Sequence, residues 1–316
     1  MPNLEVECVN PAAVGPHPLT SQQALHFRHA LSGTGLFDDD ALARLLDDYP
    51  AADIHVTTMT AGAGPDEPIS SWRVGTTAGL SGREIMAAVG RGQLWVNIKR
   101  LAENAPTYQI LLLDLYRQLA DNLKCEPPKW QRATLLISSP RASVYYHADS
   151  IPNVLWHIRG EKKVFVYPYD DPHFAPPEQI EMICSGEVEE QLKYKADFEA
   201  AAQCFLLKPG QAVTWPQHSP HRVINTQGLN VSLSTEHITP QARRKVNLYR
   251  GNRLLRKMGM QPRINPPDSL AGRTKQALGV YQSAMKKVRR KAPISFKLTP
   301  TFRVDPNADL GYRDIN

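Results

Sequence analysis

A series of short β-type segments between residues 132 and 238 most constrains how this chain can fold. The runs are RATLLISS, ASVYYHAD, NVLWHIRG, KKVFVYP, QCFLLKPGQAVTWP, HRVIN and NVSLSTEHI, with turn residues between them. Many short, evenly spaced strands are typical of a sandwich or barrel rather than of a parallel sheet. The stretch IRGEKK predicts a hairpin turn between two of these strands. We therefore expect a small double-stranded barrel.

Helical patterns flank the barrel on both sides. Before it, SQQALHFRHALSG, DDDALARLLDDYP, LSGREIMAAVGRG and PTYQILLLDLYRQLADNL space their apolar residues as helices do. The predicted helix starts are Ser21, Asp38 or Asp39, Ser81 and Pro106. After the barrel, QARRKVNLYRGNRLLRKMG and SLAGRTKQALGVYQSAMKKVRRK continue the helical pattern. The sequence thus predicts an α+β fold with a mainly helical N-terminal region (1–130), a β core (131–239) and a basic helical C-terminal region (240–316).

The composition is that of an ordinary soluble globular protein, with 42% hydrophobic and 22% charged residues. No run of 18 apolar residues predicts a transmembrane helix, and the start of the chain does not resemble a secretory signal. The four cysteines lie far apart and form no CxxC pair, which argues against a disulfide framework and a structural zinc site. We therefore expect a cytoplasmic protein.

The net charge of +6 hides an asymmetry. From residue 239 onward there are 18 Lys and Arg against 4 Asp and Glu, whereas the preceding residues include 19 against 27. Such a basic segment suggests an acidic partner, which could be nucleic acid, an anionic membrane surface or an acidic protein. An alternative is that amphipathic helices pack one face and leave the charged face in water. No helix-turn-helix, zinc finger or RNA-binding aromatic motif accompanies the charge.

Four polar residues interrupt the otherwise apolar strands of YYHADSIPNVLWHIRGEKK. Residues two apart on a strand point to the same side, so His147 and Asp149 should project together, with Tyr145 on the same row. The segment VTWPQHSPHRVIN offers further histidines. Two histidines and one carboxylate on a metal leave three positions open, as in non-haem Fe(II) oxygenases. Lys162 could then hold the distal carboxylate of a chelating co-substrate such as 2-oxoglutarate, and Asn153 could orient a metal ligand.

The segments HADSIPNVLWHIRGEKKVFVYP and LKPGQAVTWPQHSPHRVIN…NVSLSTEH resemble the two halves of the JmjC/cupin-like Fe(II)- and 2-oxoglutarate-dependent oxygenases. This family includes the asparaginyl hydroxylase that inhibits hypoxia-inducible factor, and the closer likeness is to its bacterial cupin-like branch. The resemblance implies a double-stranded β-helix (jelly-roll) as the catalytic core at 131–239. It also implies that His147, Asp149 and His221 bind the metal, that Lys162 binds the co-substrate and that Asn153 supports the site.

Many members of this family have Thr or Ser where this chain has Val144, and the hydroxyl there assists the distal carboxylate. Here we expect Ser143 or Tyr145 to replace it, and Tyr145 is therefore a predicted co-substrate residue. Three further residues are expected to have structural roles: His218 on a solvent-exposed rim, and His157 and Trp215 in the core.

The sequence therefore predicts an Fe(II)- and 2-oxoglutarate-dependent oxygenase. We expect a hydroxylase of a protein side chain or small molecule that produces succinate and CO2, with substrate contacts in the helical front and the loop at 61–80. One alternative is a non-catalytic cupin-like sensor or transcriptional regulator whose basic C-terminal helices bind nucleic acid. Another is a cupin metalloenzyme that does not use 2-oxoglutarate. The family resemblance also suggests a homodimer formed through the helices at 240–290.

Overall fold

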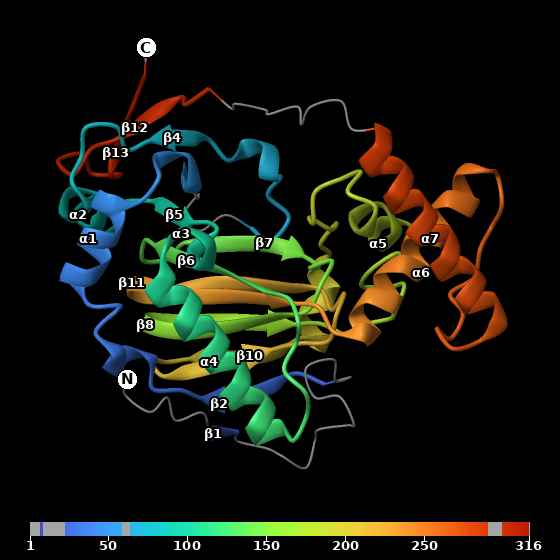
Figure 1. The fold of residues 1–316 in the computed structure, drawn as a ribbon. Helices are drawn as coiled ribbons and strands as arrows, with labels where there is room; N and C mark the ends of the chain where they lie inside the picture. Colours follow the sequence, from blue (N-terminus) through green and yellow to red (C-terminus); the bar gives the residue numbers. More distant parts are fainter. Residues whose placement is uncertain (1–6, 9–22, 59–63, 290–298, 316) are drawn as a thin grey trace.

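The structure, a computed structural model, describes residues 7–8, 23–58, 64–289 and 299–315 (Figure 1). Its helices are α1 (Asp39–Asp48), α2 (Gly82–Arg91), α3 (Leu101–Asn104), α4 (Pro106–Leu123), α5 (Pro177–Cys184), α6 (Pro240–Lys257) and α7 (Leu270–Arg289). Its strands are β1 (Glu7–Cys8), β2 (Leu25–Arg28), β3 (Ile54–Thr58), β4 (Val74–Thr76), β5 (Leu94–Ile98), β6 (Gln131–Ser138), β7 (Ser143–His147), β8 (Asn153–Val166), β9 (Gln203–Leu207), β10 (Gln211–Thr214), β11 (His221–His237), β12 (Phe302–Val304) and β13 (Tyr312–Asp314). The predicted α+β class is confirmed.

Two four-stranded antiparallel layers share the long strands β8 and β11. One layer contains β10, the first half of β8, the second half of β11, and β6. The other contains β9, the second half of β8, the first half of β11, and β7. Leu155 and Val213 of the first layer lie in one buried cluster with Val164, Leu207 and Val223 of the second, so the layers face each other. This is the predicted jelly-roll core.

Strand β8 passes from one layer to the other at Gly160, whose φ is 81°. A Cβ atom at this position would lie 2.7 Å from the carbonyl oxygen of Leu229, so both the space and the backbone angle require glycine. The opposite bend in β11 lies at Gly228, where φ is 67°. Both halves of β8 pair with β11. The predicted hairpin turn in IRGEKK is therefore wrong: this stretch lies within the single strand β8 and bends it from one layer to the other.

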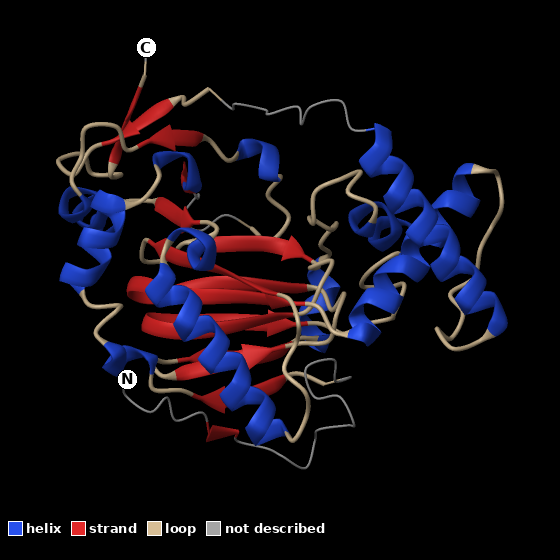
Figure 2. Cartoon of the chain, in the orientation of Figure 1, coloured by secondary structure: helices blue, strands red, loops and turns tan. Residues whose placement is uncertain are grey.

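Helix α4 covers the outer face of the first layer, as Figure 2 shows. Its Leu115 and Leu119 lie in the same core cluster as Leu135 and Trp156 of the strands beneath. The buried hydroxyl of Tyr116 lies 3.0 Å from the hydroxyl oxygen of Thr235 on β11, so the contact also includes a polar bond. The helix begins with Pro106 at its first turn, as the sequence predicts.

The N-terminal region is less helical than predicted, because strands β1 to β5 extend the sheet at both edges. The segment around LHFR, predicted to lie in a helix, forms strand β2 and pairs with β10. Its period is two, since Leu25 and Phe27 are buried between partly exposed neighbours. Two predicted helix starts are confirmed at Asp38 and Ser81, and Ser21 lies outside the described residues.

The C-terminal region begins with helices α6 and α7, which lie beside α5 at the end of the barrel (Figure 1). It is not wholly helical, because β12 returns to pair with β4 of the N-terminal region and β13 pairs with β12. This late strand pairing was not visible in the sequence, since each strand has only three residues. The predicted region boundaries at 130 and 239 remain predictions.

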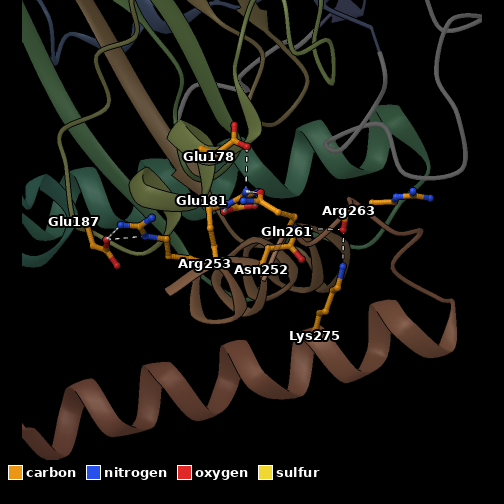
Figure 3. Close-up of polar contacts among 9 residues, drawn as sticks. Glu178, Glu181, Glu187, Asn252, Arg253, Gln261, Arg263 and Lys275 are labelled. Carbon is orange, nitrogen blue, oxygen red and sulfur yellow. Dashed lines mark hydrogen bonds and ion pairs between the residues drawn. The ribbon is translucent and has the colours of Figure 1, made fainter. Parts of the chain in front are cut away.

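Many cations of α6 form ion pairs with acids of the barrel region rather than pointing into solvent. Arg256 pairs with Glu178 and Glu181. Figure 3 shows Arg253 against Glu187. The Arg256 Nε atom lies 2.8 Å from Glu181 Oε2, and Glu181 is fully buried. The acidic body and the basic tail that the sequence shows therefore meet at an internal interface, where several of their charges neutralise each other.

Candidate metal centre

His147, Asp149 and His221 meet where strand β7 ends and strand β11 begins. Their nearest ligand atoms all lie within 4.8 Å of one another. His147 closes strand β7 and stands opposite His221, the first residue of β11. Asp149 Oδ1 lies 3.9 Å from His147 Nε2, and its Oδ2 lies 3.6 Å from His221 Nε2. The side chains predicted as metal ligands thus converge although Asp149 and His221 lie 72 positions apart in the sequence.

Hydrogen bonds orient both imidazoles toward the centre of this cluster. His147 Nδ1 lies 2.8 Å from the carbonyl oxygen of Tyr145, and His221 Nδ1 lies 3.1 Å from that of Ser219. A carbonyl oxygen only accepts, so Nδ1 must carry the proton in each ring. Both Nε2 atoms then present a lone pair toward Asp149, which is the tautomer that a metal ion requires.

Burial sets the charge state of the three side chains. It lowers the pKa of His147, and it lowers that of His221 well below its usual value, so both rings are neutral at pH 7. Burial also raises the pKa of Asp149 to about 7, with a further rise from the negative charge of Glu236. Hydrogen bonds from Trp215 and Asn153 oppose this rise. Asp149 Oδ2 is buried without a hydrogen-bond partner among the described residues, so a cation bound there would satisfy it.

A bulge in β7 decides which residues of that strand face the barrel interior. His147 stands opposite His221, yet Val144 stands opposite Val223, so three residues on β7 span two on β11. The bulge places Val144 in the cavity below the metal ligands. Tyr145 instead packs its ring 5.0 Å from that of Trp72. The Tyr145 ring also lies 5.2 Å from that of His147, so the two side chains are neighbours although the bulge makes the row irregular. The role of Tyr145 toward the co-substrate remains a prediction.

Lys162 lies deeper in the barrel, in a cavity of about 30 Å³ with room for one or two water-sized groups. It pairs with Asn225 four residues along β11 from His221. Its side chain is 4% exposed, and burial lowers its pKa to about 7. Among the residues that the structure describes, no acceptor lies within hydrogen-bond distance of Lys162 Nζ.

Two further donors that the sequence did not reveal line the same cavity. Trp95 lines it from strand β5, and its buried Nε1–H has no acceptor among the described residues. Ser138 lines it from β6, and its hydroxyl oxygen accepts a hydrogen bond of 2.8 Å from Asn225 Nδ2. The Ser138 hydroxyl hydrogen therefore remains available for another acceptor. Lys162, Trp95 and Ser138 together make a cavity rich in donors, which suits a carboxylate.

The remaining predicted residues have mixed outcomes. The Asn153 amide bonds the Ser234 hydroxyl at 3.0 Å besides contributing a bond to Asp149, which fits the expected supporting position. His157 is a core residue as expected, with bonds to the Ser232 hydroxyl and the Gly160 carbonyl. His218 is 2% exposed, so its expected place on a solvent-exposed rim is wrong. Its Nε2 atom lies 3.3 Å from the Cys184 sulfur, under helices α5 and α6.

Two residues that the sequence did not assign to the site lie near the candidate metal ligands. The ring of Trp215 lies 4.2 Å from that of His221, so this tryptophan forms a wall of the site besides its place in the core. Glu190 accepts a hydrogen bond from the Ser150 amide. Burial is the main cause that raises the pKa of Glu190 to about 7, and the negative charge of Asp149 adds to it. The WPxxxPH spacing could have pointed to Trp215, whereas Glu190 comes from a loop distant in sequence.

A segment of the predicted substrate loop lies against the end of β7 that carries His147. The Tyr146 amide donates to the Pro65 carbonyl, and the Ile69 amide donates to Gln191 Oε1 at 2.8 Å. Gln191 in turn forms an isolated β-bridge with His147. The segment at 64–72 is therefore fixed beside the site.

Among the described residues, no helix is long and apolar enough to cross a membrane. No protein-family model matches the chain, and no curated protein matches it.

Several solved structures match the chain at low similarity. One is YcfD of E. coli, with 16% identity and a TM-score of 0.46 over 87% of this chain and 66% of that one. A second YcfD structure, described as a ribosomal oxygenase in complex with cobalt and 2-oxoglutarate, has 15% identity and a TM-score of 0.42 over 85% and 64%. An RmlC-like cupin from Shewanella frigidimarina has 14% identity and a TM-score of 0.22 over 35% and 68%. The chain thus spans slightly less than two thirds of the length of the YcfD structures. Likeness at this level does not establish a family, so the chemistry is inferred from the residues of the chain itself.

Proposed function

We propose that this protein is an Fe(II)- and 2-oxoglutarate-dependent oxygenase that hydroxylates a protein side chain or a small molecule. The observation that carries the proposal is the cluster of His147, Asp149 and His221, with both Nε2 atoms free and one buried carboxylate oxygen unpaired. Two neutral imidazoles and a carboxylate suit a non-haem iron site with open positions.

The donor-rich cavity supports 2-oxoglutarate as the co-substrate. A dicarboxylate that chelates the metal through its 2-oxo acid has a second carboxylate to place deeper in the barrel. Lys162 lies four strand residues from the pair that contains His221, which is about 13 Å along the strand between Cα atoms. An extended lysine side chain and a five-carbon dicarboxylate, placed end to end, bridge this distance. We assign the distal carboxylate to Lys162, with bonds from Ser138 and Trp95.

Ser138 provides the hydroxyl that the family pattern places at the position of Val144. The two residues line the same cavity from different strands, Ser138 from β6 and Val144 from β7. In this chain the hydroxyl donor therefore comes from β6 rather than from β7, and the cavity still contains a hydroxyl.

Iron and 2-oxoglutarate, when bound, would supply the oxidising chemistry that cleaves O2, with succinate and CO2 as products. The chain supplies binding and exclusion of water. His147 and His221 hold their tautomers through backbone carbonyls, and Asn153 and Trp215 hold Asp149 in place. The wall formed by Trp215 keeps bulk solvent from one side of His221. The segment at 64–72 is where we expect substrate specificity to reside.

The test begins with anaerobically purified protein to which Fe(II), 2-oxoglutarate and O2 are added. We expect metal-dependent succinate formation that is lost in His147→Ala and kept in His173→Ala, a matched control at an exposed histidine. Because turnover can require the substrate, the second measurement is calorimetry of 2-oxoglutarate binding to the Mn(II)-loaded protein. Absence of both succinate and binding would contradict the proposal.

A further inference from the structure

A basic groove lies between the loop that joins α4 to β6 and the first turns of α6. Its cavity has a volume of about 850 Å³. Four cationic side chains line it, and Glu126 is the acid that lines it with them. The cations are Lys124, Lys129, Arg243 and Arg244.

Three of the four groove cations differ from the other cations of α6, whereas the fourth, Arg244, lies 3.0 Å from Asp268 Oδ1. Arg253 and Arg256 are neutralised by acids of the barrel region. Within the described residues, by contrast, Lys124, Lys129 and Arg243 are exposed and have no ion-pair partner. A concave surface that concentrates unpaired charge of one sign focuses its potential on a ligand of the opposite sign.

An aromatic side chain stands next to these cations. Trp130 follows Lys129 directly and is 39% exposed. It lines a second hollow of about 670 Å³ that shares the stretch from Glu126 to Lys129 with the basic groove. Arg117 lines this second hollow, and the Arg132 guanidinium lies 5.9 Å from the Trp130 ring centre. A partly exposed aromatic ring thus lies directly beside the cations of the groove.

The groove is connected to the metal-binding end of the barrel through one side chain. Gln217 Nε2 donates to the carbonyl of Ser150, which follows Asp149, and to the carbonyl of Ala242 in the first turn of α6. The distances are 3.0 and 3.3 Å. Gln217 therefore links the first turn of α6, beside the groove, to the backbone next to Asp149.

We propose that this groove binds single-stranded nucleic acid. Lys124, Lys129 and Arg243 would contact phosphodiester oxygens, and a base would stack on Trp130. A membrane surface suits a flat or convex basic face with apolar side chains to insert, whereas this site is concave. An acidic peptide would neutralise the cations but would leave the exposed tryptophan unused. The inference is independent of the oxygenase proposal, because it rests on a different surface.

The experiment measures binding of fluorescein-labelled 20-nucleotide single-stranded RNA and DNA to the full chain by anisotropy, between 50 and 200 mM salt. The test variant is the double charge reversal Lys129→Glu/Arg243→Glu. The matched control is Arg44→Glu/Lys208→Glu, which makes the same change of net charge at two exposed positions on α1 and in the β9–β10 turn. Thermal unfolding checks that each variant is folded. If the charge-reversal variant is unfolded, Lys129→Gln/Arg243→Gln is used in its place.

We expect the test variant to weaken binding about tenfold or more at 50 mM salt. Its slope of log affinity against log salt should fall by about 1.4, since two phosphate contacts are lost at about 0.7 each. Trp130→Ala should weaken binding about fivefold or more with the slope unchanged. Comparison of RNA with DNA shows which nucleic acid is preferred.

Three results would overturn the proposal: no binding of either strand at 50 mM salt, equal losses in the test and control variants, or full competition by polyglutamate or by vesicles of anionic lipid at matched charge.

Discussion

Replacement of Lys162 by methionine should separate the stability of the barrel from its function. Lys162 is buried in a cavity without an acceptor among the described residues, and burial alone lowers its pKa from 10.5 to about 7. Methionine has a similar length and no charge, so the variant removes the desolvation cost while it keeps the cavity filled. We expect Lys162→Met to be more stable than the wild type and defective in binding 2-oxoglutarate.

The size of the effect follows from the pKa shift. A shift of about 3.5 pH units corresponds to roughly 5 kcal/mol at about 1.4 kcal/mol per unit, which is an upper limit. Replacement of buried charges by apolar residues gains about 1–4 kcal/mol, and we expect a value in that range. Because the pKa is lower in the folded state, the folded protein binds fewer protons than the unfolded chain between about pH 7 and 10.5. Wild-type stability should therefore rise with pH across this window, and the advantage of the variant should shrink.

The assay is urea unfolding of the metal-free protein at pH 6.5 and pH 9.5, with Lys163→Met as the control, because Lys163 is exposed on the same strand. In turnover, the KM for 2-oxoglutarate should rise about tenfold to a hundredfold when the charge-assisted bond is lost. The reasoning is refuted if Lys162→Met is less stable than the wild type at pH 6.5, or if its KM for 2-oxoglutarate is unchanged.

Four further substitutions test separate regions of the structure. Asp149→Asn removes the anionic ligand and should abolish Co(II) binding followed by absorption; in the wild type, binding should weaken as the pH falls below about 7, because Asp149 becomes protonated. Ser138→Ala should raise the KM for 2-oxoglutarate about threefold to tenfold and leave kcat unchanged, as steady-state kinetics would show. Arg256→Met leaves the buried carboxylate of Glu181 unpaired and should cost about 3–5 kcal/mol in urea unfolding. Gly160→Ala forces a side chain into positive φ against a backbone oxygen and should cost about 1–3 kcal/mol in the same assay.

Each of these predictions can fail in a distinct way. Retained Co(II) binding in Asp149→Asn would mean that the carboxylate is not a ligand. An unchanged KM in Ser138→Ala would place the distal carboxylate elsewhere. Wild-type unfolding midpoints for Arg256→Met or Gly160→Ala would show that the ion pair or the corner contributes little to stability.

Much of the site could be predicted from local sequence because its signals are local. His147 and Asp149 lie two residues apart near the end of a strand, and Lys162 lies on the next strand along the chain. The β-type runs from 132 to 238 correspond to strands β6 to β11 for the same reason: apolar strands separated by turn residues have a short-range pattern. The helix starts at Asp38, Ser81 and Pro106 could also be predicted, since a helix cap depends on three or four neighbouring residues.

What failed depends on partners far away in the chain. The segment around residue 26 was predicted as a helix but forms strand β2. Pairing with β10 stabilises the extended backbone and buries every second side chain. His218 is buried because helices α5 and α6 cover it. The residues next to His218 in the sequence do not indicate this burial. The basic tail looked like a free charged surface, yet Arg256 pairs with Glu181 from a helix 75 residues earlier.

The sequence by itself determined the types of the candidate ligands, their order and the strands that carry them, since these are properties of short segments. Only the tertiary structure decided that a bulge in β7 places Val144 below His147, and that Ser138 and Trp95 bring their donors to Lys162. These arrangements depend on the register between strands and on packing across the barrel. Register is fixed by the burial of whole faces and by backbone pairing over many residues, so it cannot be found in any one segment.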